Sequence, residues 1–128
     1  MIKESIFQTR FNKWVKARWN KTALFELKVT SKPLPFNAVL QHQKDALVAT
    51  KHRSLIFKIP DDSRSYKPAD CFCLAKEDAY VVIMYYELRK STFIMIDIDD
   101  FLEEEKNSDR KSLTEDRARE IGIECSFK

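Results

Sequence analysis

The chain has 128 residues, of which 44% are hydrophobic, and this is the size and composition of one domain with its own core. One glycine and four prolines exclude collagen-like and linker-rich sequences. The three cysteines and two histidines lack the spacing of a zinc site, and Cys71 and Cys73 share a strand face, which predicts reduced thiols in the core. The longest apolar run, residues 79–86, is too short to cross a membrane. No signal peptide is recognisable, so we expect a cytoplasmic protein, or a viral one acting in the host cytoplasm.

The net charge of +3 is divided unevenly along the chain. Residues 1–60 contain 12 Lys and Arg but 3 acidic residues, whereas residues 61–128 contain 11 and 17, so the two halves carry charges of +9 and −6. This asymmetry predicts a basic face that binds a polyanion. Nucleic acid is favoured over a membrane surface, because no amphipathic segment lacks a core to join.

Residues 3–19 predict the first helix, because apolar side chains recur along one face. The predicted buried stripe comprises Phe7, Phe11, Trp14, Val15 and Trp19. On another face, Arg10, Lys13 and Lys16 form either a ridge that contacts phosphates or an ordinary solvated surface. Glu4 is able to face inward, but its position favours a role in complementing the helix dipole.

Residues 23–29, Ala-Leu-Phe-Glu-Leu-Lys-Val, predict a short apolar strand that carries one acid and one base. Side chains at positions i and i+2 of a strand point to the same face, so Glu26 and Lys28 project together. The pair is either an ordinary ion pair on a half-exposed strand or a site that holds a metal and handles a water. The E-x-K tripeptide is too common to decide between these by itself.

A helix is expected to follow over residues 36–51, with Pro35 at its first position. Gln43 falls on the apolar stripe of this helix. A buried amide needs a hydrogen-bond partner, so Gln43 either satisfies a backbone group in the core or acts beside Lys28. Residues 55–59 then predict a strand, and the order strand, helix, strand predicts a right-handed parallel crossover.

The second half of the chain is expected to complete the sheet. Residues 60–68 predict a turn-rich loop, which brings Asp70 to the start of a strand at residues 71–74. Residues 79–86 are apolar on both faces, as in a central strand covered by helices on each side. Residues 92–98 are expected to pair with this central strand in a hairpin.

The C-terminal part is predicted to be helical and structural in role. Residues 99–105 favour a short helix. A last helix is expected after a cap at Ser112 or Thr114, and Gly122, the only glycine, is expected to end it. No residue of this segment indicates chemistry.

The acids and the lysine combine into a catalytic hypothesis. Glu26 and Asp70 would supply hard oxygen ligands to Mg²⁺, or to Mn²⁺, and the metal would polarise a phosphodiester and help to ionise an attacking water. Lys28 would orient that water or stabilise the charge that develops on the phosphate. Such a set suits phosphodiester hydrolysis and not acyl transfer. Asp61 and Asp62 are expected to form a turn, although either could replace Asp70.

The sequence Phe-Glu-Leu-Lys-Val-Thr at residues 25–30, followed by Pro35-Phe36 and by Gln-His-Gln at residues 41–43, resembles the PD-(D/E)XK nuclease superfamily. The hallmark of that superfamily is an acid on one strand, (D/E)-x-K on the next, and then a helix that often bears an inward glutamine. Within it, residues 24–47 look most like RecU-type Holliday-junction resolvases.

This resemblance implies a restriction-endonuclease-like core in which Glu26 is a metal ligand, Lys28 is the motif lysine and Gln43 is the helix glutamine. The first acid of the family normally precedes the E-x-K motif, yet residues 5–25 contain no Asp or Glu. Asp70, preceded by Pro-Ala, looks like the missing P-x-D, which predicts a displaced acid and a rearranged strand order. If the Asp70 carboxylate does not reach Glu26, the site lacks its second carboxylate.

We therefore expect one α/β domain over residues 1–128, with a mixed central sheet flanked by helices, that acts as a Mg²⁺-dependent endonuclease on branched DNA, most like a Holliday-junction resolvase. The resemblance also implies a homodimer, and no membrane partner is expected. Two alternatives stay open: a DNA- or protein-binding module without catalysis, and a nuclease for duplex ends or nicks. The residues expected to contact the DNA backbone are Arg10, Lys13, Lys16, Lys32, Lys51 and Arg53.

Overall fold

The computed structural model of the chain describes residues 2–59 and 70–128, with the side chains of Ile59 and Asp70 outside that description. The helices are α1 (Glu4–Arg18), α2 (Gln41–His52), α3 (Ile98–Asn107) and α4 (Glu115–Ile121), with a short 3₁₀ helix, η1, at Phe36–Ala38. The strands are β1 (Ala23–Thr30), β2 (Leu34–Pro35), β3 (Ser54–Ile59), β4 (Asp70–Ala75), β5 (Asp78–Tyr85), β6 (Thr92–Asp97), β7 (Ser112–Leu113) and β8 (Ile123–Ser126). None of the helices in these two ranges combines the length and the apolar character of a membrane span.

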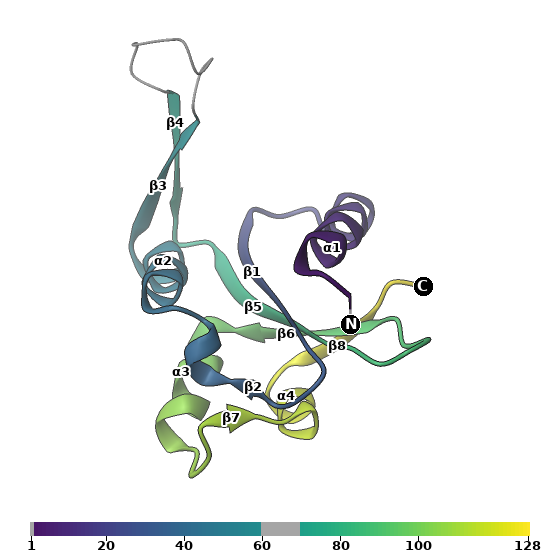
Figure 1. Ribbon diagram of the computed structural model, residues 1–128. Coiled ribbons are helices and arrows are strands. Elements are labelled where there is room, and N and C mark those ends of the chain that lie inside the picture. The colour runs from purple at the N-terminus through teal and green to yellow at the C-terminus, as the bar shows by residue number, and fades with distance from the viewer. Residues whose placement is uncertain (1, 60–69) are drawn as a thin grey trace.

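A mixed four-stranded sheet with the order β1-β5-β6-β8 forms the centre of the molecule (Figure 1). β1 runs parallel to β5, with Glu26 opposite Val81, whereas β6 is antiparallel to both β5 and β8. A parallel pair needs a long connection, and here the connection contains α2 and the β3–β4 hairpin. The fold is therefore mixed α/β with a mixed central sheet, as the sequence predicts.

The alternation of side chains along β5 divides the core into two layers. Val81 and Ile83 belong to the layer that contains α2, α3 and α4, whereas Val82 and Met84 belong to the layer that contains α1. All four side chains are buried. This confirms the prediction of a central strand, because a strand that is apolar on both faces has to be covered on both.

Helix α1 covers its face of the sheet with aromatic side chains, as its stripe predicts. Phe7 and Phe11 are buried, and Trp14 and Trp19 are half-buried against the same cluster. The ring of Phe11 meets the ring of Phe93 on β6 edge to face, with centroids 5.4 Å apart. Such pairs add to the free energy gained from burial, so they fix the helix on the sheet.

The segment predicted as one helix from residue 36 is divided in the structure. Pro35 lies in β2, which pairs with β7, and the N–H of Phe36 donates to the C=O of Lys111 at 3.0 Å. Leu34 and Phe36 are both buried, and η1 and an extended Leu40 follow before α2 begins. Tertiary packing of these apolar side chains thus overrides their helical spacing.

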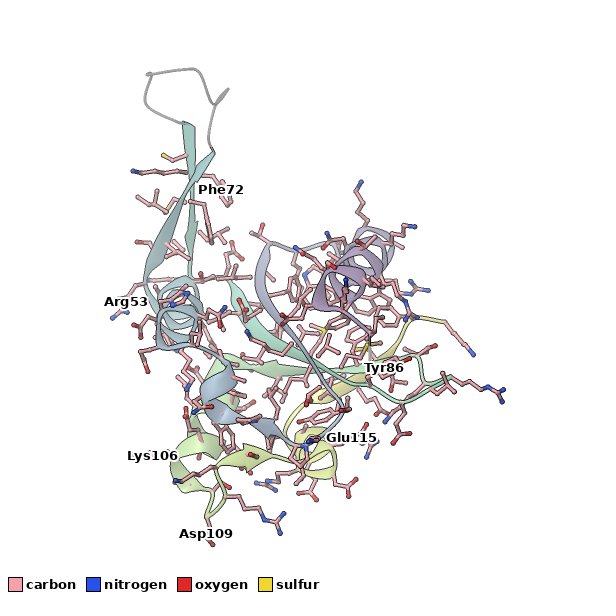
Figure 2. The ribbon with its side chains drawn as sticks, in the orientation of Figure 1. Arg53, Phe72, Tyr86, Lys106, Asp109 and Glu115 are labelled. Carbon is pink, nitrogen blue, oxygen red and sulfur yellow. The ribbon has the colours of Figure 1, made fainter. Side chains whose placement is uncertain are left out.

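The strand predicted at residues 55–59 is present as β3, but the prediction of a parallel crossover from β1 to this strand is wrong. β3 pairs antiparallel with β4 in a separate two-stranded sheet, which we call the arm and which projects from the body (Figure 1). The crossover from β1 ends at β5 instead. The arm is long enough to carry its side chains away from the body, as Figure 2 shows for Phe72.

The prediction that Cys71 and Cys73 are core residues is also wrong, because both are exposed on the arm. They share a face of β4, as expected, but the arm has two strands, and no further layer of described residues covers that face. Leu74, nearer the body, is buried. Cys125, on β8, is half-buried.

The last helix begins and ends as predicted, but its glycine has a different role. The hydroxyl of Thr114 accepts from the N–H of Arg117 at 3.2 Å, and Gly122 follows the last helical residue. The φ of Gly122 is −129°, which any residue can adopt. A Cβ atom there would lie 2.7 Å from the carbonyl oxygen of Met95 on β6, so Gly122 is required by the close approach of the junction between α4 and β8 to β6.

We expect Gly122→Ala to lower the free energy of unfolding by about 1–3 kcal/mol, because the added methyl group overpacks a closed contact. Urea unfolding followed by circular dichroism measures this. Ser31→Ala, at an exposed position, serves as a control with a change of less than about 0.5 kcal/mol. An unchanged midpoint for Gly122→Ala would show that β6 and α4 separate at little cost.

Candidate functional site

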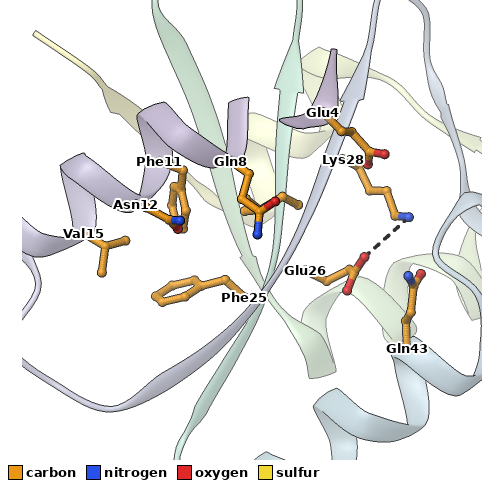
Figure 3. Close-up of a pocket in the computed structure, with 10 residues that line it drawn as sticks. Glu4, Gln8, Phe11, Asn12, Val15, Phe25, Glu26, Lys28 and Gln43 are labelled. Carbon is orange, nitrogen blue, oxygen red and sulfur yellow. Dashed lines mark ion pairs between the residues drawn. The ribbon is translucent and has the colours of Figure 1, made fainter. Parts of the chain in front are cut away.

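A cavity of about 390 Å³ lies where α1, β1 and α2 meet (Figure 3). Its wall consists of Glu4, Gln8, Phe11, Asn12 and Val15 from α1, Phe25, Glu26, Leu27 and Lys28 from β1, and Gln43 from α2. β1 is an edge strand of the central sheet, so the cavity lies along an edge that no described strand covers. Its volume is within the range of small-ligand sites.

Glu26 and Lys28 project together, as predicted from their spacing. The ammonium nitrogen of Lys28 lies 3.5 Å from the Oε1 atom of Glu26 (Figure 3). The side chain of Glu26 is 27% exposed and that of Lys28 is 15% exposed, so the pair is partly accessible to water. An acid and a base at this separation can act on one substrate group, since both reach into the same cavity.

Gln43 lies on the same cavity wall, and its amide caps a backbone group, which is one of the two roles that the sequence leaves open. Its Oε1 atom accepts a hydrogen bond from the N–H of Leu40 at 2.9 Å, which anchors the amide at the start of α2. In Figure 3 the amide group of Gln43 points towards Glu26 and Lys28. The capping bond therefore holds the amide in a fixed position beside the charged pair.

Glu4 is a cavity residue that the sequence reasoning assigned to another role. It lies in the first turn of α1, where an acid complements the helix dipole, and it also lines the cavity across from Lys28. The sequence contains a pattern that indicates this position, because Glu4, Gln8 and Asn12 are spaced by four residues. That spacing places all three side chains on one face of a helix, and this face forms the α1 side of the cavity.

Asp70 is the first residue of β4, where its backbone pairs with Ile59 at the outer end of the arm. The strand extends from Asp70 to Ala75 next to the body, a span of about 16 Å at the usual rise per residue. The arm leads away from the central sheet in Figure 1. The approach of the Asp70 carboxylate to Glu26 stays a prediction, and Asp61 and Asp62 lie outside the described residues.

The side chains of the cavity wall that could bind a metal are carboxylates and amides. Glu4 and Glu26 contribute carboxylates, and the part of the wall that is described contains no Cys or His. Over residues 2–59 and 70–128, no three His, Cys, Asp or Glu side chains come together as a metal site. Mg²⁺ is often bound by one or two carboxylates while water and substrate phosphate complete its coordination. The donor set is thus compatible with Mg²⁺ and unsuited to Zn²⁺.

The outward face of α1 is basic. Lys13 and Lys16 are exposed, and the Arg10 guanidinium lies 4.3 Å above the ring of Phe127. In the described part of the chain, none of these three cations has an acidic partner within ion-pair distance. Lys32 and Arg53 are exposed as well, and Figure 2 shows Arg53 directed to solvent. These five predicted DNA contacts are accessible to a phosphate group.

Lys51, the sixth predicted contact, is already engaged. Its ammonium lies 2.6 Å from Asp97 Oδ1 and 2.7 Å from Asp99 Oδ2. Burial alone would lower the pKa of Lys51, but the hydrogen bonds to both aspartates outweigh burial and raise it. His52 also contacts Asp99, at 2.9 Å. These contacts connect the end of α2 to the start of α3. They give Lys51 a structural role that needs no contact with DNA.

Comparison of the chain with protein-family models, with curated proteins and with solved structures gives no match in any of the three. The case for a function therefore depends on the motif spacing and on the geometry of the cavity.

The aspartate that joins α2 to α3 predicts an acid-sensitive stability. Burial alone would raise the pKa of the Asp99 carboxyl, but hydrogen bonds from Lys51 and His52 hold it below its usual value of 3.8. A carboxyl with a lowered folded-state pKa stabilises the fold above pH 3.8, and this contribution is lost as the pH falls through the folded-state pKa. We expect the unfolding free energy of the native chain to decrease below about pH 4, and that of Asp99→Asn to decrease less.

Urea midpoints measured from about pH 3 to pH 6 test this expectation. Asp109→Asn, at an exposed position with no ion pair among the described residues, is the matched control and should follow the native curve. Parallel curves for the native chain and for Asp99→Asn would contradict the role given to Asp99.

Proposed function

We propose that the chain is a Mg²⁺-dependent DNA endonuclease with a restriction-endonuclease-like core, acting on branched DNA such as a Holliday junction. The observation that carries the proposal is that Glu26, Lys28 and Gln43, selected by the motif resemblance, line one cavity and point towards one another. Their positions depend on three separate features: the strand alternation of β1, the start of α2, and the packing of α2 near β1. A motif match that arose by chance would give no reason for these three side chains to line the same cavity.

The roles of the side chains follow from their chemistry. Glu26, with Glu4 from the opposite wall, would hold the Mg²⁺ ion, which when bound supplies a Lewis acid for the phosphate and an acidified water. The Lys28 ammonium, 3.5 Å from Glu26, is placed to hold an attacking water or a phosphate oxygen beside that carboxylate. The anchored amide of Gln43 would orient the same groups by hydrogen bonds.

The charge distribution supports a polyanionic substrate on the α1 side. Lys13 and Lys16 line a shallow hollow that shares Asn12 and Val15 with the catalytic cavity. The acids are concentrated on α3 and α4, which lie on the other face of the sheet. A DNA strand held by the basic side chains of α1 would therefore pass the mouth of the cavity. A resolvase cuts two symmetric strands, so a homodimer is part of the proposal.

A second candidate function is a DNA-binding module without catalysis. It is favoured by the absence of a three-acid group among the described side chains and by the existing pairing of Glu26 with Lys28. A nuclease for duplex ends or nicks would use the same residues as the resolvase and would differ only in substrate.

Cleavage assays on variants test the catalytic assignment. We expect Glu26→Gln and Lys28→Met to slow Mg²⁺-dependent cleavage of a labelled four-way junction by about 100-fold or more while DNA binding is retained. Glu87→Gln, an exposed acid outside the cavity, is the matched control. Comparison of Glu4→Gln with Asp70→Asn then identifies the second carboxylate. Binding without cleavage by the native chain in Mg²⁺ and in Mn²⁺ would instead establish the non-catalytic module.

The substrate and the oligomeric state are tested separately with the native chain. Initial rates on four-way, flap and linear DNA are expected to be highest on the four-way junction. Light scattering is expected to give twice the chain mass of 15.1 kDa. Equal rates on all three substrates would refute the resolvase assignment and leave a general nuclease.

The basic face predicts a salt-dependent affinity. Replacing Lys13 and Lys16 with Gln should reduce the slope of log K against log salt by about 0.9 for each phosphate of duplex DNA that the variant no longer neutralises. Lys51→Gln should leave this slope unchanged and lower stability instead, because Lys51 is paired with Asp97 and Asp99. Equal effects of the two replacements on the slope would contradict the assignment of DNA contacts to α1.

A further inference from the structure

We infer that the α1 side of the cavity binds one unpaired nucleobase of the DNA strand whose phosphate lies at Glu26 and Lys28. The inference rests on the proposed nuclease function and specifies which part of the substrate is recognised beside the cleaved bond.

The cavity has two chemically different sides, and the alternation of β1 separates them. Glu26 and Lys28 share the face of Leu24, which packs in the layer of α2. Phe25 and Leu27 point to the layer of α1. The side towards α2 thus holds the charged pair suited to phosphate chemistry, while the side towards α1, apart from Glu4 in the first turn of the helix, is formed by amides and apolar groups.

Two amide side chains face the cavity from α1. Gln8 and Asn12 are one helical turn apart, and both are directed towards β1 in Figure 3. Neither amide makes a hydrogen bond with another described side chain or backbone group. Each one offers a donor and an acceptor, and Asn and Gln amides form paired hydrogen bonds with the edges of bases.

The edge of β1 adds backbone groups to this side of the cavity. The C=O of Thr30 accepts from the N–H of Tyr86 at 2.7 Å, so Thr30 directs its backbone groups towards β5. Alternate residues of a strand direct theirs to opposite sides, and therefore Phe25, Leu27 and Val29 present theirs to the free edge. Within the described ranges, no backbone or side-chain group is hydrogen-bonded to these outward groups.

An aromatic side chain with a fixed position completes the surface. The Phe25 ring is stacked on Tyr80 at 5.8 Å with an interplanar angle of 16°, and it meets Phe11 edge to face at 5.0 Å. Because neighbouring rings already hold Phe25, it loses little conformational freedom when a ligand binds. An apolar aromatic wall beside free amides suits a planar heterocycle, which is the chemistry of a nucleobase.

The base has to be unpaired to use this site. In a duplex each base is stacked between its neighbours, so it can enter the cavity beside Phe25 only after it has left the stack and its pair. Such a base is present in a bulge or a flap, and at a branch point once the base pair beside it opens. The exposed cations Lys13 and Lys16, in the adjoining hollow, favour a nucleic acid over an added peptide strand at this edge.

The experiment uses the Glu26→Gln chain, so that cleavage does not interfere with binding. Affinities are measured by fluorescence anisotropy for two labelled duplexes that differ only at one bulged position, which carries either a base or an abasic site. We expect the duplex with the base to bind roughly tenfold more tightly. We expect the added replacements Gln8→Ala and Asn12→Ala to remove most of this difference. Gln41→Ala, an exposed amide of α2 outside the cavity, should keep it.

The outcomes separate this inference from the function on which it rests. Equal affinity for the two duplexes would overturn the nucleobase site while leaving DNA binding intact. A preference that persists after both replacements would place the base elsewhere and also overturn it. If the Glu26→Gln chain and the native chain bind neither duplex, the proposed function fails, and the nucleobase site fails with it. Because Gln8 and Asn12 are exposed, unfolding midpoints should confirm that the variants remain folded.

Discussion

The parallel pairing of β1 with β5 is the constraint on which the candidate site depends. It places β1 at the edge of the central sheet between α1 and α2, so that a cavity follows the uncovered edge. The two-residue period of the strand then divides the chemistry between the faces: Glu26 and Lys28 towards α2, and Phe25 towards α1. Burial of β5 on both faces fixes this arrangement, because a shift of register by one residue would exchange the two faces.

Charged side chains are distributed unevenly between the two faces of the central sheet. The acids of α3 and α4 are largely neutralised in place, for instance by Arg117 with Glu104 at 2.8 Å and by Arg119 with Asp116 at 2.8 Å. The cations on the outer face of α1 have no such partners among the described residues. Exposed ion pairs add little stability, but an unpaired basic surface beside a cavity attracts a polyanion. A nuclease with its cavity between α1 and α2 would use this asymmetry to orient its substrate.

The sequence predicts several residues of the candidate cavity, but not the features that long-range packing decides. The grouping of Glu26 with Lys28 follows from strand spacing, and a capping role for Gln43 is one of the two that its position on the helix allows. The position of Glu4 in the first turn of α1 favours a role with the helix dipole, and the sequence alone does not show that this side chain also lines a cavity. Alternation predicts that Cys71 and Cys73 share a face but not whether anything covers that face, so the expectation that they are core residues is wrong.

The sequence by itself determined most of the local elements, since the periodicities of 3.6 and 2 and the cap at Thr114 act over a few residues. The tertiary structure alone decided which strand pairs with β1, the projection of β3 and β4 as an arm, and the engagement of Lys51 by Asp97 and Asp99. These outcomes depend on contacts between residues that are far apart in the chain. Their free energies arise only when two apolar or charged surfaces meet, and local periodicity carries no information on the partner.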